Sequence, residues 1–224
     1  MADLEIDHTL LLIALGLLYL PRQWLRWGKR VVKSERLSRH GDSNNFDPSK
    51  RREMGDPAVI FKDEFSKLRN YVDLFRAIAG SAVVVGTAYT PSCFRVAAEA
   101  PPGLARGVLV LKFVILLGAM LVQLIRYERR LTLFAPIFFV AGLTFGLSGV
   151  AAAGFAFLLV WALNLVLPSA SAFLTTQAVL ILVFGTLLGE RGDLFVMAAF
   201  FCLFLPVLIS MLTGRSLQTF HRRG

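Results

Sequence analysis

Charged and reactive side chains are scarce in this chain of 224 residues. Charged residues make up 17% of it, where soluble domains carry about 25%. The three histidines, His8, His40 and His221, lie near the ends or in a polar linker, and no two share an apolar segment at a metal-ligand spacing. We therefore expect neither a bound metal nor a cofactor.

Cysteine and catalytic motifs are equally sparse. The two cysteines are Cys93, in a predicted loop, and Cys202, inside an apolar run, so we expect no disulfide between them. The sequence has no nucleophile elbow, no phosphate-binding loop and no paired carboxylates. These absences predict that the protein is not an enzyme.

Long apolar runs dominate the remainder. The chain is 56% hydrophobic, with a mean hydropathy of +0.64. A run of about 20 apolar residues crosses the hydrocarbon core of a bilayer as a helix. Backbone polar groups must be paired in lipid, and these runs lack the alternation of a barrel strand. The predicted fold is an all-α, polytopic transmembrane bundle of about seven spans, or six if the first is only partly inserted.

The expected spans divide the chain into four parts. Residues 1–27 form an N-terminal anchor, which we expect to be retained because acidic rather than basic residues precede its apolar run. Residues 28–70 form a basic linker, with an amphipathic helix expected from 57. A six-helix membrane domain covers 71–212, and 213–224 is a basic tail. Within 71–212 the expected spans are 71–89, 107–125, 131–147, 150–167, 173–188 and 194–212.

Basic residues predict the orientation. If the N-terminus lies outside and the spans alternate, 19 of the 24 Lys and Arg residues fall on the cytoplasmic side, which is the side that retains them. The C-terminus is then cytoplasmic, and we expect a multi-pass protein of the cell inner membrane. The net charge of +9 is therefore attributed to membrane flanks and anionic lipid rather than to nucleic acid.

Four polar residues within the spans are candidates for function. Asp73 and Arg76 are three residues apart, so they share a helix face and can pair. Either Arg76 reaches the inner headgroups, or the pair is a polar site that Gln123, at a similar depth, could join. Lys112 is expected near the outer interface, where it would extend to headgroups.

Two small-residue motifs predict close helix packing. Gly142 and Gly146, and likewise Gly185 and Gly189, are four residues apart in apolar segments, a spacing that lets helix backbones approach each other. The partner helix could belong to this chain or to another subunit.

The linker carries a basic cluster at Lys50, Arg51 and Arg52, far from the first span. We expect it to bind anionic headgroups or an acidic partner on the cytoplasmic side.

The leading hypothesis is a non-enzymatic membrane subunit or scaffold. It would pack with other membrane protein subunits and lipids and present the basic face to the cytoplasm. One alternative is a small-solute or ion transporter or pore that uses the intramembrane polar residues, with Asn164 and Gln177 added. Another is a lipid-modifying membrane enzyme.

Overall fold

Helices make up most of the part of the chain that the computed structural model describes, which is residues 3–21, 58–127, 131–189 and 191–218. The α-helices are α1 (His8–Tyr19), α3 (Phe61–Phe65), α4 (Leu68–Val85), α5 (Pro102–Leu124), α6 (Ile137–Ser148), α7 (Val150–Leu163), α8 (Ala170–Leu188) and α9 (Asp193–Thr213), and a 3-10 turn, η2 (Asn164–Val166), follows α7. Two short antiparallel pairs are the only strands in these ranges: β1 (Leu4–Ile6) with β2 (Phe94–Val96), and β3 (Ile125–Tyr127) with β4 (Leu131–Leu133).

Three helices, α5, α8 and α9, are long and apolar enough to cross a membrane, with 23, 19 and 21 residues. This is the mark of a membrane protein. The apolar helices α1, α6 and α7 are shorter. Helix α4 has 18 residues but carries three charged ones, Arg69, Asp73 and Arg76.

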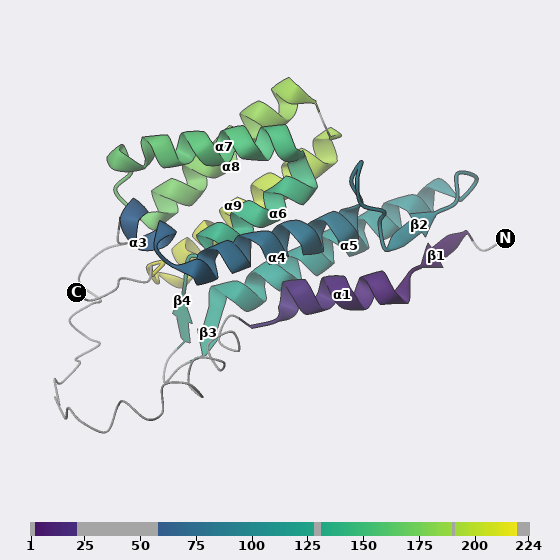
Figure 1. The fold of residues 1–224 in the computed structure, drawn as a ribbon, viewed down its shortest axis with the longest axis horizontal. Coiled ribbons are helices and arrows are strands. Elements are labelled where there is room, and N and C mark those ends of the chain that lie inside the picture. Colours follow the sequence, from purple (N-terminus) through teal and green to yellow (C-terminus); the bar gives the residue numbers. More distant parts are fainter. Residues whose placement is uncertain (1–2, 22–57, 128–130, 190, 219–224) are drawn as a thin grey trace.

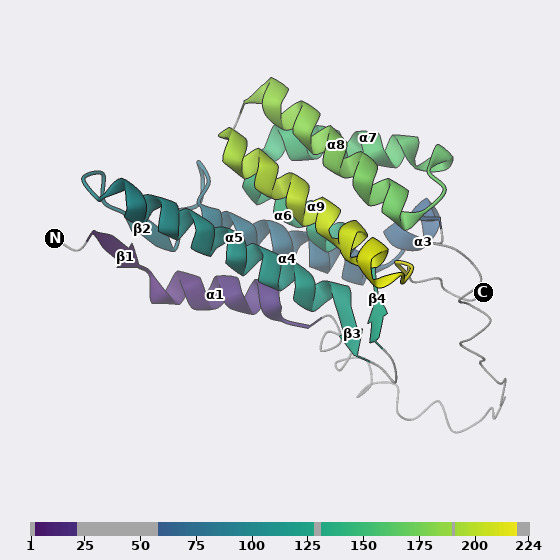
Figure 2. The ribbon, with the colours of Figure 1, turned by 180° about the vertical axis from the view of Figure 1, so that it is seen from behind.

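The helices lie side by side in a bundle with α6 at its centre. Figures 1 and 2 show α1, α4 and α5 on one side and α7 and α8 on the other, with α6 and α9 between them. Helix α6 packs against α4 and α9 above all, and Phe145 is its only residue that is not buried. A helix enclosed in this way is apolar all round, because every face meets protein.

Helix α4 buries its polar face. Its buried residues include Asn70, Asp73 and Arg76, whereas Leu68 and Phe75 are 74% and 64% exposed. In water this arrangement would be unfavourable, because burying apolar area lowers the free energy of the fold and burying a charge raises it. The buried charges of α4 thus face other helices, and apolar side chains lie on its outer face.

Three expected boundaries are wrong. The span expected at 131–147 begins as strand β4, and its helix starts only at Ile137, because Pro136 disfavours a helical residue before it and is suited to a helix start. The amphipathic helix expected from 57 is broken at Ser66 and Lys67 into α3 and α4. Helix α5 begins at Pro102, inside the expected loop, since proline suits the first helical position.

The other expected spans are close to the observed helices, although α1 ends at Tyr19 and residues 22–27 of the expected first span lie outside the described ranges. The segments expected outside gather at one end of the bundle, where β1 pairs with β2 and Arg191 binds the Gly86 carbonyl. The β3–β4 pair lies at the other end, where Phe134 bridges to Gln218 near the C-terminus (Figure 1).

Candidate functional site

The C-terminal end of α1 is the point where polar side chains from three helices meet. The last carbonyls of a helix have no partner within it and must be satisfied from outside. The Arg76 guanidinium, from α4, donates to the Leu20 carbonyl. The Gln123 amide, from α5, donates to the carbonyls of Leu20 and Leu18 at 3.1 and 3.3 Å. A further bond joins α1 to α5, since the Tyr19 hydroxyl donates to the Ile115 carbonyl at 2.8 Å.

Asp73 completes this cluster. Its carboxylate pairs with Arg76 at 2.9 Å, and the two side chains are only 3% and 5% exposed. The Arg76 guanidinium also lies over the Phe139 ring of α6, 5.1 Å from the ring centre, a favourable cation–π geometry. The expected Asp73–Arg76 contact is therefore present, and Gln123 shares a carbonyl with Arg76. The Arg76 side chain points into the bundle, where it contacts the end of α1 and the Phe139 ring of α6.

Lys112 lies far from that cluster, at the end where α4 stops. Its ammonium donates to the Val85 carbonyl at 3.2 Å, and Arg191 donates to the next carbonyl, that of Gly86, at 2.7 Å. Two half-buried cations thus cap the negative end of the α4 dipole. Lys112 is turned toward α4, and not simply outward as expected. The sequence gives no sign of this contact of Arg191 with α4, because the partner carbonyl lies 105 positions away.

Asn164 and Gln177 lie in a third region, on η2 and α8. The Asn164 amide donates to the Val59 carbonyl at 2.8 Å and so holds the segment before α3 against the end of α7. Gln177 is fully buried, and neither its amide nitrogen nor its oxygen has a hydrogen-bond partner within the described ranges. A buried amide without hydrogen-bond partners destabilises the fold unless another group accepts and donates these bonds.

The glycine motifs serve packing within this chain. A Cβ added at Gly142 would lie 2.5 Å from the Leu74 carbonyl oxygen, and one at Gly146 would meet the side chain of Ser81, so this motif brings α6 against α4. Gly185 likewise faces Val196 of α9. Gly189 is not a packing residue. It ends α8 in the left-handed conformation, with φ of +59°, and its surroundings are open.

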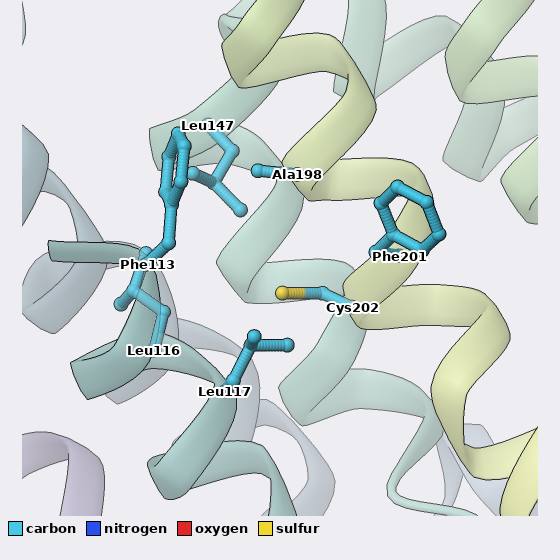
Figure 3. Close-up of a pocket in the computed structure, with 7 residues that line it drawn as sticks. All are labelled: Phe113, Leu116, Leu117, Leu147, Ala198, Phe201 and Cys202. Carbon is cyan, nitrogen blue, oxygen red and sulfur yellow. The ribbon is translucent and has the colours of Figure 1, made fainter. Parts of the chain in front are cut away.

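A hollow between α5, α6 and α9 has a volume of about 140 Å³ and no polar lining (Figure 3). Its lining residues are Phe113, Leu116, Leu117, Leu147, Ala198, Phe201 and Cys202. None of the polar candidates lines it.

The two cysteines are free and buried, in agreement with the expected lack of a disulfide. Burial raises the pKa of the Cys93 thiol, an effect that the nearby Lys112 ammonium partly offsets. In the ranges that the structure describes, no three His, Cys, Asp or Glu side chains gather in a metal-binding group. The basic cluster Lys50, Arg51 and Arg52 lies outside those ranges.

No family model, no curated protein and no solved structure matches this chain. The inference of function therefore depends on the residues and contacts above.

Proposed function

We propose that the protein is a non-enzymatic membrane subunit or scaffold. Its helices pack with other membrane protein subunits and lipids, and its basic segment, residues 28–70, meets anionic headgroups or an acidic partner on the cytoplasmic side.

The observation that carries this proposal is the dispersal of the polar candidates. A transporter needs polar side chains that converge on one path. Here Arg76 and Gln123 hold the end of α1, Lys112 holds the end of α4, and Asn164 holds the segment before α3. Each of these side chains donates to a backbone carbonyl of another element. Polar groups used in this way join helices to each other, which is what a scaffold requires.

The apolar outer surface agrees with this role. Large hydrophobic side chains are exposed along the outer faces of four helices: Val110 and Val114 on α5, Phe155 and Leu158 on α7, Val183 and Leu187 on α8, and Phe201 and Met211 on α9. Lipid or the helices of another subunit would cover them.

We also propose that all seven apolar segments lie in the cell inner membrane as a multi-pass bundle, with the N-terminus outside. Helix α6 has 12 residues and spans about 18 Å, less than the hydrocarbon core. Its length is no obstacle, because non-helical backbone is tolerated at membrane depth where protein covers it, and α6 is almost wholly covered.

The test is to purify the tagged full-length chain in mild detergent, measure the mass of the particle, and identify the membrane proteins that accompany it. We expect a particle heavier than the chain alone, with a stoichiometric partner that an unrelated membrane protein, purified in the same way, does not retain. In parallel, proteoliposomes containing the chain should show no ion flux above protein-free vesicles.

A lone chain that conducts ions, with conduction lost in a well-folded Gln177→Leu variant, would overturn the proposal and favour the transporter. Gln177 is the informative position because its buried amide has no partner among the described residues.

A further inference from the structure

The hollow between α5 and α9 is a groove with a closed floor and an open side. Leu116, Leu147 and Cys202 are buried and form its floor. Phe113, Leu117 and Ala198 are half-buried, and Phe201 is 53% exposed. Figure 3 shows the residues of α5 and α9 on opposite sides of the gap, with the Cys202 sulfur pointing toward α5. The groove therefore opens on the outer surface of the bundle, the surface that lipid would cover.

The lining excludes water and polar ligands. An apolar cavity of roughly 150 Å³ stays dry and accepts hydrocarbon, and this groove, of about 140 Å³, has only carbon and one thiol on its walls. In a bilayer, the hydrocarbon available to this groove is the acyl chain of a lipid.

Two cations lie beyond one end of the groove. Lys112 is one helical turn before Leu116 on α5, and Arg191 precedes the first turn of α9. The Arg191 guanidinium lies over the Phe195 ring, 5.9 Å from its centre, and that ring contacts Phe113 of the groove edge-on at 5.7 Å. Since Lys112 and Arg191 bind consecutive carbonyls, their charges lie close together.

This pair of charges lacks a counter-ion in the described part of the chain. Carbonyl groups supply dipoles but no net negative charge, and neither cation forms an ion pair with a described carboxylate. A phosphate would neutralise both cations, and it binds well where Lys and Arg converge.

We propose that the groove binds one acyl chain of an anionic phospholipid, whose phosphate is held by Lys112 and Arg191. The charge at one end and the hydrocarbon groove one turn deeper match the order of groups along such a lipid. The site requires that the bundle lies in a membrane, but it does not depend on the scaffold role. A chain with no protein partner could still hold this lipid, and a scaffold could lack it.

The experiment is native mass spectrometry of the full-length chain in detergent, titrated with phosphatidylglycerol or with phosphatidylcholine of the same acyl length. We expect one phosphatidylglycerol to remain bound at concentrations at which phosphatidylcholine does not. The double variant Lys112→Gln, Arg191→Gln should weaken this binding about tenfold or more. Its matched control is Arg106→Gln, an exposed arginine on the same helix, which should bind as the wild type does.

A second variant tests the groove itself. Ala198→Phe should fill the hollow from its half-buried rim and reduce phosphatidylglycerol binding with both cations intact, whereas Met197→Phe, at the exposed neighbouring position, should not. Inorganic phosphate is added as a competitor at millimolar concentration. If phosphate alone displaces the lipid fully, or if Ala198→Phe binds normally, the groove is not the lipid site. Equal retention of both lipids would also overturn the proposal.

Discussion

The Asp73–Arg76 pair shows how single charged residues are accommodated in this bundle. Arg76 is held by a carboxylate, a backbone carbonyl and an aromatic ring, each from a different helix or turn of the core. A buried charge is tolerated when it is paired and its donors are used, and it becomes costly once one partner is removed.

Asp73→Asn should therefore destabilise the protein strongly, because it leaves the Arg76 charge buried without its carboxylate. Loss of one partner of a buried pair costs about 3–5 kcal/mol. The double variant Asp73→Asn, Arg76→Gln should lose less, since no charge remains and Gln still has a donor for the Leu20 carbonyl. Thermal unfolding of the purified protein in detergent measures both. A stable Asp73→Asn variant that alters ion flux would contradict a structural role for the pair.

The Cys93 thiol should react slowly with maleimide. Its pKa is raised by burial, so at neutral pH the reactive thiolate is rarer than in an exposed cysteine. In a Cys202→Ala background, labelling of Cys93 near neutral pH should be slower than labelling of the exposed cysteine in Ala98→Cys, with Cys93→Ala, and should increase as the pH is raised. Equal labelling rates at pH 7 would contradict this prediction.

At the scale of the elements, α4 and α6 form the most extensive helix–helix contact in the described part of the chain. Glycines on α6 meet the backbone and small side chains of α4, so the two helices approach without intervening side chains. The consequence is that the enclosed helix, α6, depends on the absence of a Cβ at two positions.

Gly142→Ala should lower the melting temperature, although alanine is the better helix former. The new Cβ would lie 2.5 Å from the Leu74 carbonyl oxygen and force the helices apart, and overpacking of this kind costs about 1–3 kcal/mol. Gly154→Ala on α7 is the matched control. No atom lies within 4 Å of its added Cβ, so the gain in helix propensity should leave stability equal or higher. The same loss in both variants would mean that close packing is not the cause.

At the scale of the whole molecule, the two ends of the bundle differ in what they expose. The end with β1 and β2 carries the loops expected outside, and the end with the β3–β4 pair carries Gln218, the last described residue of the basic tail. The proposed orientation therefore predicts which loops a membrane-impermeant reagent reaches.

Single cysteines at Ala98 and Gly103 should be labelled from outside intact cells, because both positions are exposed. Cysteines at Ser216 and at Ser43, the second of which lies outside the described ranges, should be labelled only after the membrane is opened. Ser92 is a poorer probe, since its hydroxyl binds the Val84 carbonyl. Labelling of Ser43→Cys in intact cells would reverse the orientation.

A separate prediction concerns the basic segment, residues 28–70. Each basic residue near an anionic surface contributes about 1 kcal/mol. Replacing Lys50, Arg51 and Arg52 with Gln should leave folding and topology unchanged but weaken binding of the segment to anionic liposomes, most visibly at low salt. The charge-matched control replaces the three arginines of the tail, Arg215, Arg222 and Arg223, with Gln. Unchanged binding would mean that the cluster only sets orientation.

The sequence determined the class of the protein, because the length and apolarity of a run are local properties. Helices α5, α8 and α9 were recognisable from composition alone, as was the i, i+3 pairing of Asp73 with Arg76. The strand at Leu131–Leu133 and the break at Ser66 were not recognisable from the sequence. A three-residue strand is too short to show an apolar–polar alternation, and a break at one or two residues leaves the helical pattern on either side unchanged.

Only the tertiary structure decided which face of α4 is buried and what its polar groups hold. Arg76 finds its carbonyl 56 positions away and Gln123 finds the same one 103 positions away, and no periodicity within a helix contains those partners. The same holds for Lys112 and Arg191, which are distant in sequence and meet only because α4 ends between α5 and α9. Periodic patterns give the faces of single helices, and the packing of several helices decides what each face meets.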